Sequence, residues 1–253
     1  MMWKMLQSSI AGTSHAQLGT PCQDASRIAL IHSELTDDVL VLSCADGAGS
    51  SKYASEASLA ACNHLCSIVE NHVQASEGEL RLDTDVVKLW IDGIHEHLGK
   101  LATESNESMR EWACTFLGGV LTKDKSLFFQ LGDGAIVRQI EPDGFHTVFW
   151  PDNGEYANQT NFITDENYAA NIQSILLEEP TTGIAMLTDG IQRLALDFKL
   201  QDAHAPFFRP MFEALRQADQ TTQLEMELTK FLSSDAVNKR TDDDKTLVLA
   251  RWC

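Results

Sequence analysis

Val39-Leu40-Val41-Leu42-Ser43-Cys44-Ala45 is an apolar stretch that runs directly into Asp46-Gly47. The pattern occurs twice more, where apolar residues lead into Asp133-Gly134 and into Asp189-Gly190. A buried strand ends where its backbone reaches solvent, so an Asp at that point lies at the rim of the core. Glycine beside it permits a sharp turn or a close backbone approach. Carboxylates gathered at one rim repel one another unless cations lie among them, so the pattern indicates a hard-metal site.

Asp-Gly is also a common turn dipeptide, and each copy has that alternative interpretation. Asp143-Gly144 is interpreted in this way, as a hairpin turn between strands at 135–140 and 145–149. The three copies that end strands are different because further acids accompany them. Asp24 precedes them, and the run Asp242-Asp243-Asp244 stands just before the closing strand.

Composition narrows the classes of function. The 253 residues carry a formal net charge of −18 and contain no Lys/Arg-rich run, which argues against binding the phosphate backbone of nucleic acids. No stretch approaches the roughly 18 apolar residues of a membrane span. The six cysteines have neither metal-site nor disulfide-framework spacing, as expected in a reducing compartment. We therefore expect a cytoplasmic, monomeric protein that binds neither nucleic acid nor membrane.

The order of predicted elements indicates the fold class. Two pairs of helices interrupt hairpin-linked strands, without the alternating rhythm of a doubly wound sheet, so the pattern predicts an α+β layered domain. No linker divides the chain, and residues 1–253 are expected to form one domain. The polar, aperiodic segment 150–174 is expected to be a functional loop or lid. Strands are predicted at 3–11, 26–33, 38–45, 113–122, 126–132, 135–140, 145–149, 183–188 and 245–251, and helices at 51–74 (capped by Ser50-Ser51), 84–104, 206–218 and 221–235.

Oxygen ligands without His or Cys partners favour Mg²⁺, Mn²⁺ or Ca²⁺. An EF-hand is rejected because the Asp242-Asp243-Asp244 run lacks the spaced oxygens, central Gly and terminal Glu of that loop. Carboxylates from distant strands suit a rigid site for two metals, whose bridging water attacks phosphorus in line. The chain lacks a G-x-x-x-x-G-K nucleotide loop, so hydrolysis is favoured over nucleotide-driven transfer.

Five motifs span nearly the whole chain: Pro21-Cys22-Gln23-Asp24-Ala25, Ala45-Asp46-Gly47-Ala48-Gly49, Leu131-Gly132-Asp133-Gly134, Leu187-Thr188-Asp189-Gly190 and Asp243-Asp244-Lys245-Thr246. In this order they resemble the motifs of the metal-dependent protein phosphatase family, the protein phosphatase 2C type, and of a bacterial branch within it. The resemblance implies the family's fold, a four-layer αββα sandwich of two mostly antiparallel sheets flanked by helix pairs.

The resemblance also implies roles for individual residues. Asp46 would bridge two Mg²⁺ or Mn²⁺ ions, and the carbonyl of Gly47 would complete the shell of one of them. Asp189 and Asp243 would bind the first metal. Asp24 would act through a metal-bound water, and Asp133 with Asp189 would hold a weaker third ion.

The implied activity is that of a serine/threonine phosphoprotein phosphatase. Its substrates would be phosphoserine or phosphothreonine on proteins, with a cognate kinase as partner, and residues 150–174 would be the family's variable flap. Two other classes remain open. One is a non-catalytic regulatory or interaction module on the same fold, and the other is a hydrolase of small phosphorylated metabolites.

Three departures from the family's pattern bear on catalysis. The Arg that commonly grips the substrate phosphate is missing, and its neighbourhood holds His15. Gln23 stands where many members have Glu, and Ala48 stands where some have a His that is proposed as general acid. His15 is therefore a candidate catalytic residue beside Asp46 and Asp189, with satisfaction of a local backbone group as the alternative.

Overall fold

The computed structural model describes residues 2–32, 38–76, 80–140, 144–151 and 160–253. Its framework is a pair of five-stranded antiparallel sheets, as the alternation of strands and hairpins predicted. Sheet A has the order β1 (Trp3–Ile10), β12 (Lys245–Trp252), β9 (Gly183–Leu187), β6 (Ala135–Ile140) and β7 (Gly144–Thr147). Sheet B has the order β2 (Asp24–Ile31), β3 (Val39–Asp46), β4 (Phe116–Leu121), β5 (Ser126–Leu131) and β8 (Gln173–Leu177).

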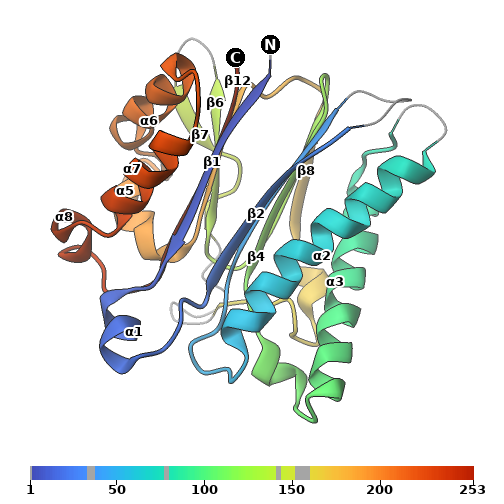
Figure 1. Cartoon of the computed structure of the whole chain (residues 1–253). Coiled ribbons are helices and arrows are strands. Elements are labelled where there is room, and N and C mark those ends of the chain that lie inside the picture. The colour runs from blue at the N-terminus through green and yellow to red at the C-terminus, as the bar shows by residue number, and fades with distance from the viewer. Residues whose placement is uncertain (1, 33–37, 77–79, 141–143, 152–159) are drawn as a thin grey trace.

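Two helix pairs cover the outer faces of the sheets (Figure 1). Helices α2 (Ala54–Ala75) and α3 (Thr84–Glu104) pack on sheet B, and α6 (Ala205–Gln217) and α7 (Thr222–Leu232) pack on sheet A. This arrangement confirms the four-layer sandwich. Short elements complete the described chain: α1 (Thr13–Leu18), a 3-10 turn (Met109–Trp112), α4 (Tyr168–Asn171), a second 3-10 turn (Asp189–Ile191), α5 (Gln192–Ala195), β10 (Leu196–Asp197), β11 (Asp202–Ala203) and α8 (Asp235–Asn238).

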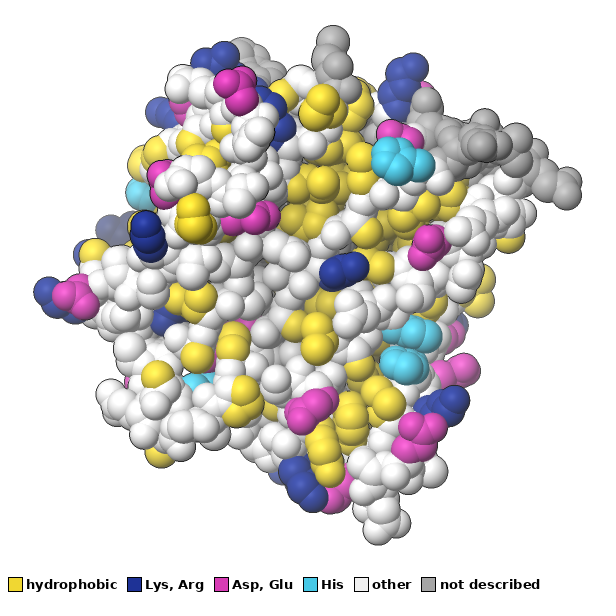
Figure 2. Space-filling model, in the orientation of Figure 1, with side chains coloured by type: hydrophobic (Ala, Val, Ile, Leu, Met, Phe, Trp, Pro, Cys, Tyr) yellow, Lys and Arg dark blue, Asp and Glu magenta, His cyan; other side chains and the backbone are white. Residues whose placement is uncertain are grey.

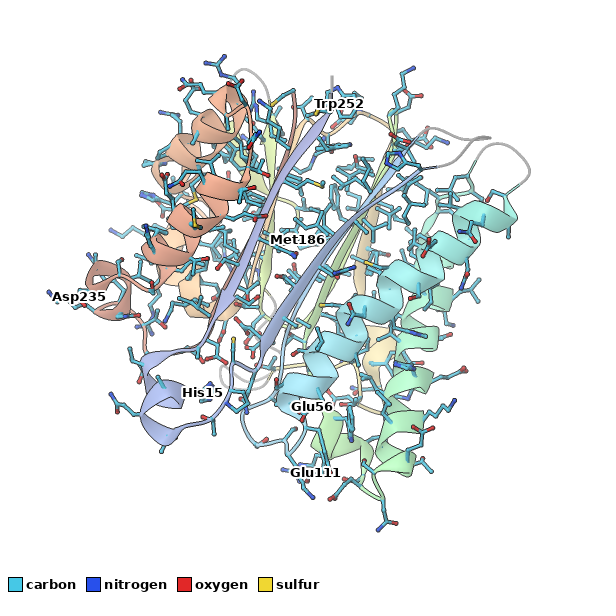
Figure 3. All side chains as sticks on the ribbon, viewed as in Figure 1. His15, Glu56, Glu111, Met186, Asp235 and Trp252 are labelled. Atoms are coloured by element: carbon cyan, nitrogen blue, oxygen red, sulfur yellow. The ribbon has the colours of Figure 1, made fainter. Side chains whose placement is uncertain are left out.

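The hydrophobic core divides into three parts because four layers have three internal faces. One part joins α2 and α3 to sheet B, and another joins α6 and α7 to sheet A. The third lies between the sheets, where Leu42 and Phe128 of sheet B meet Met186 and Val248 of sheet A. Figure 3 shows Met186 in this central position.

The edge strands β1 and β2 lie next to each other on the face shown in Figure 2. Apolar side chains reach the surface there between the two helix layers. From these strands Trp3, Met5, Ile28 and Leu30 are partly buried and pack against the inter-sheet core. Among the described helices, none combines the length and the apolarity needed to cross a membrane.

Some details differ from the expectations. Ser51 does not cap α2: the helix begins after Tyr53, and the Ser51 hydroxyl donates a hydrogen bond to the carbonyl of Arg110 at 2.6 Å. Segment 150–174 is not structureless throughout, because α4 forms within it and β8 begins at Gln173. Residues 152–159 of this segment, and Asp143 of the expected hairpin turn, lie outside the described residues.

Candidate metal centre

The acidic residues that lie at the ends of strands, whether before, at or after them, converge at one end of the sandwich. Asp24 begins β2 and Asp46 ends β3, and the two are direct partners in the antiparallel register. Directly opposed residues have Cβ atoms about 5 Å apart. The pairing therefore sets these two carboxylates side by side on sheet B.

Sheet A supplies two further carboxylates at the same end. Asp189 follows β9 and Asp243 precedes β12, and these strands are antiparallel neighbours with Leu187 opposite Leu247. The end of one strand therefore lies beside the start of the other. Asp133 lies in the turn that leads from β5 of sheet B to β6 of sheet A, so it bridges the two sheets at this edge.

A pocket of about 230 Å³ opens where these strands end. Asp46, Gly47, Asp133, Asp189 and Asp243 all line it. Asp24 is not part of the lining but lies buried beside Asp46. Five of the six residues expected to hold metal thus share one pocket, and the sixth is next to it.

Burial and mutual repulsion raise the pKa of these carboxyl groups. Burial is the largest cause of the raised pKa of Asp46, followed by the charges of Asp24, Asp189, Asp243 and Asp133. The pKa of Asp189 is raised by burial and then by Asp133 and Asp243. Burial also raises the pKa of Asp24, although hydrogen bonds from threonine hydroxyls oppose the shift. A bound cation would relieve this repulsion.

Threonine hydroxyls make hydrogen bonds to three of these acidic residues. Thr188 donates to Asp24 Oδ2 at 2.7 Å, and Thr115 accepts from the backbone N–H of Asp46 at 3.0 Å. Thr160, which also lines the pocket, donates to Asp133 Oδ2 at 2.9 Å. The contacts of Thr188 and Thr160 hold the carboxylates of Asp24 and Asp133, and the contact of Thr115 holds the backbone of Asp46.

The glycines of two Asp-Gly pairs allow another backbone segment to pack directly against them. A Cβ on Gly47 would lie 2.2 Å from the carbonyl oxygen of Ala54, at the start of α2. A Cβ on Gly190 would lie 1.8 Å from the carbonyl oxygen of Asp244. Neither glycine has a positive φ. Their role is therefore to let α2 and the Asp244 turn approach the site.

The structure identifies Asp244 as a site residue that the sequence did not single out from its acidic run. Its side chain is almost fully buried and accepts hydrogen bonds from the backbone N–H groups of Gly12 and Gln23, each at 2.6 Å. Its Oδ1 also lies 2.8 Å from Nδ1 of His15. Asp244 thereby joins α1, the Gln23 segment and the turn that carries Asp243.

His15 lies on α1, at the same end of the molecule as the pocket, and lines it (Figure 3). Because its Nδ1 is taken up by Asp244, Nε2 is the ring nitrogen left for other contacts. The alternative interpretation, a bond to a local backbone group, is wrong for Nδ1. Gln23 and Ala48 also line the pocket, and the described lining contains neither Arg nor Lys.

The residues present fit a hard divalent cation. The donors are carboxylate oxygens, and Oδ1 of Asp24 is buried without a hydrogen-bond partner. Within the described ranges no three His, Cys, Asp or Glu side chains are placed to hold one ion by themselves. The fit to a hard cation therefore rests on the pocket shared by the carboxylates and on the unpartnered Oδ1 of Asp24.

Two comparisons by sequence found similar proteins. The family model described as "Protein phosphatase 2C" matches residues 11–233. The chain is 39% identical over 255 residues to "Serine/threonine-protein phosphatase 3" of Escherichia coli (strain K12), covering 100% of this chain and 99% of that protein.

Solved structures share the fold at low sequence identity. A serine/threonine phosphatase from Staphylococcus aureus has a TM-score of 0.61 at 15% identity, over 100% of this chain and 96% of that one. The S. agalactiae serine/threonine phosphatase has a TM-score of 0.61 at 14% identity, over 99% of both chains.

Proposed function

The chain belongs to the protein phosphatase 2C family and is a serine/threonine-protein phosphatase, and on this premise we propose that its acidic pocket is the catalytic centre. The observation that carries the proposal is the convergence of Asp46, Asp133, Asp189 and Asp243 in one pocket. Their raised pKa values express a repulsion that cations would relieve. An enzyme, rather than a non-catalytic module, is the class that the comparisons support.

We propose two Mg²⁺ or Mn²⁺ ions in this pocket. Asp46 and the carbonyl of Gly47, together with Asp189 and Asp243, would hold them, with Asp24 acting through water and Asp133 contributing to a weaker third site. When bound, such ions lower the pKa of water and neutralise phosphate charge. Thr188 and Thr115 keep Asp24 and Asp46 in place for this role.

His15 is proposed to contact the substrate phosphate. It is the lining residue that can carry positive charge in a pocket whose described lining contains neither Arg nor Lys. Asp244 holds Nδ1, which orients Nε2 for a phosphate oxygen or for the leaving seryl or threonyl oxygen. His15 would thus serve in place of the missing phosphate-binding Arg. It could instead replace the general-acid His that some family members have where this chain has Ala48.

The physiological setting is a further part of the proposal. The substrates would be proteins phosphorylated on Ser or Thr, and a cognate Ser/Thr kinase would supply them. We propose that the protein acts as a cytoplasmic monomer composed of one catalytic domain, residues 1–253. Residues 150–174 would form the flap beside the pocket, with Thr160 and Phe162 on its described part lining it.

The test is hydrolysis of p-nitrophenyl phosphate with Mn²⁺, with and without EDTA. Asp189→Asn should lower kcat at least a hundredfold, because a charged group at the reacting centre is lost. Asp124→Asn, an exposed residue outside the described lining of the pocket, is the matched control and should retain full activity. Turnover that is insensitive to EDTA and to Asp189→Asn would contradict the metal assignment.

Substrate class is tested separately. Phosphoserine and phosphothreonine peptides should be hydrolysed faster than sugar phosphates at equal concentration. The opposite order would favour a hydrolase of small phosphorylated metabolites. His15→Gln should raise KM for the phosphopeptide and change the pH profile of kcat, whereas a purely structural role for His15 would leave the pH profile unchanged.

A further inference from the structure

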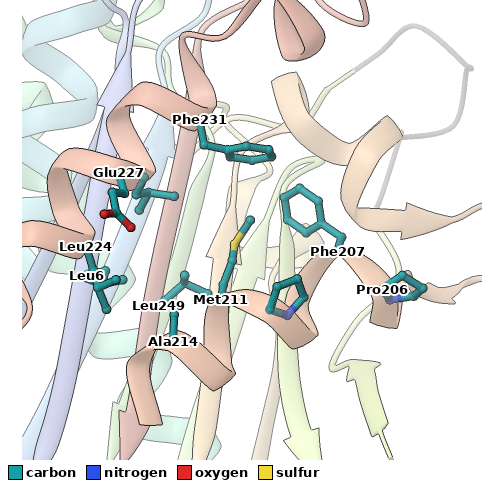
Figure 4. A pocket seen from close by; sticks show the side chains of 11 residues that line it. Leu6, Pro206, Phe207, Met211, Ala214, Leu224, Glu227, Phe231 and Leu249 are labelled. Carbon is teal, nitrogen blue, oxygen red and sulfur yellow. The ribbon is translucent and has the colours of Figure 1, made fainter. Parts of the chain in front are cut away.

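A second pocket lies between α6, α7 and the outer face of sheet A (Figure 4). Its volume is about 440 Å³, within the range of small-molecule sites. Leu6 of β1 and Leu249 of β12 form its floor, and both are buried members of the sheet A core. None of the described residues that line it lines the acidic pocket.

Apolar side chains from both helices form the walls. Phe207 of α6 and Phe231 of α7 lie 6.0 Å apart between ring centroids and join the helices at one end of the pocket. Met211 and Ala214 line it from α6, and Leu224 lines it from α7. The space is a groove open to solvent, because Phe231 and Glu227 among its lining residues are exposed. An exposed apolar groove of this kind is typical of a ligand-binding site.

Glu227 is the exception among the lining residues that the structure describes, because every other one is apolar. It lies on α7 next to Leu224, its side chain is exposed, and Oε1 accepts a hydrogen bond from Gln223 at 3.1 Å. One carboxylate at the side of an apolar pocket selects a ligand with an apolar body and a positive charge. The net charge of −18 adds a long-range preference for cations.

We propose that this pocket binds a small organic cation: an amine with a short alkyl chain or a single ring as its body. The apolar part would fill the space over Leu249 and Met211, and the ammonium group would lie against Glu227. The proposal is independent of the catalytic assignment, since the described linings of the two pockets share no residue.

The test compares n-hexylamine, n-hexanol and hexanoate, which share one chain and differ in head-group charge. Binding is followed by the methyl resonance of Met211, with Met186 of the inter-sheet core as an internal control that should not shift. Hexylamine should bind about two- to fivefold tighter than hexanol, as expected for an exposed ion pair. Hexanoate should bind most weakly.

Three variants separate shape from charge. Ala214→Phe fills the pocket and should abolish binding of all three probes, with its thermal midpoint measured to show that it folds. Glu227→Gln should leave hexylamine and hexanol with equal affinity. Glu225→Gln, on the same helix but outside this pocket, is the matched control and should retain the preference for the amine.

Equal affinity of the three probes for the unchanged protein would overturn the proposal. So would a preference for hexylamine that survives Glu227→Gln. The proposal would also be overturned if hexylamine did not bind and the protein self-associated in a way that Ala214→Phe abolished. That result would identify a second copy of the chain as the occupant of the pocket.

Discussion

Three consecutive carboxylates, Asp242, Asp243 and Asp244, precede β12, and each has a different environment. The carbonyl of Asp242 accepts hydrogen bonds from Ser14, whereas Asp243 lines the pocket and Asp244 is buried behind it. Among these three residues, the resemblance to the phosphatase family implied a metal-binding role for Asp243 only. The role of Asp244 could not be predicted because its partners Gly12, His15 and Gln23 lie 232, 229 and 221 positions away along the chain.

The glycines near the site provide a residue-scale prediction. Gly47→Ala should destabilise the protein by about 2–3 kcal/mol, because the added Cβ would overlap the carbonyl of Ala54 and force the start of α2 to move. Urea unfolding with a constant m-value measures the change.

Gly49→Ala is the matched control for this experiment. At Gly49 the nearest atom to an added Cβ is Oε1 of Gln23 at 3.7 Å, an ordinary contact, and φ is not positive. The substitution should change the free energy of unfolding by less than about 0.5 kcal/mol. Equal losses for Gly47→Ala and Gly49→Ala would show that the fit against α2 is not what requires glycine.

At the scale of elements, strong periodicity made the long helices predictable. The helices expected at 51–74 and 84–104 form as α2 and α3, and each buries one apolar side, including Ala54 and Val69 in α2 and Val86 and Leu98 in α3. Helix α1 could not be found because no residue in it is buried and Gly12 offers no side-chain cap. Strand β8 was hidden because it is an edge strand with only partly buried or exposed residues.

Two histidines at the contact between α2 and α3 should make the stability of the protein depend on pH. His64 and His97 stack with ring centroids 4.1 Å apart, 7° from parallel. Burial lowers the pKa of both, and His97 further lowers that of His64. Lys100 lowers and Glu104 raises the pKa of His97.

Because both pKa values are lowered in the folded state, the unfolded chain binds more protons as pH falls below the ordinary histidine value. The contribution of this histidine pair to the free energy of unfolding should therefore decrease between pH 7.5 and pH 5. The carboxyls of Asp24 and Asp189, whose pKa values are raised, contribute in the opposite direction, so the pair is measured by comparison. The free energy of unfolding by urea at pH 5, relative to that at pH 7.5, should be higher for His97→Gln than for the unchanged protein. His204→Gln, an exposed residue before α6, is the control. An unchanged pH dependence in His97→Gln would contradict the expectation.

At the scale of the whole molecule, the pairing of the first strand with the last strand helps to assemble the acidic pocket. Strand β12 pairs with β1, and the N–H of Met2 donates to the carbonyl of Cys253 at 2.7 Å. This pairing brings the α1 region beside the Asp243 turn, and the turn at Asp133 joins the two sheets at the same end. Periodicity predicted the layers, but strand order depends on long-range pairing that a local pattern does not encode.

Because the net charge is −18, added ions should change the stability of the protein in two ways: through its whole surface and through the acidic pocket. Any salt screens repulsion among surface carboxylates. Mn²⁺ should stabilise the protein beyond this screening, because binding at the acidic pocket favours the folded state. At a hundred times its dissociation constant the gain is about 2.7 kcal/mol.

Thermal unfolding with MnCl₂ and with NaCl of equal ionic strength separates the two effects. The midpoint should be higher in MnCl₂, and EDTA should reverse the difference. Asp46→Asn should respond equally to both salts, because Asp46 is the carboxylate proposed to contact both ions. Asp124→Asn removes the same charge from an exposed position and should keep the extra response to Mn²⁺. If Asp46→Asn kept it as well, the stabilisation would come from the charged surface and not from the pocket.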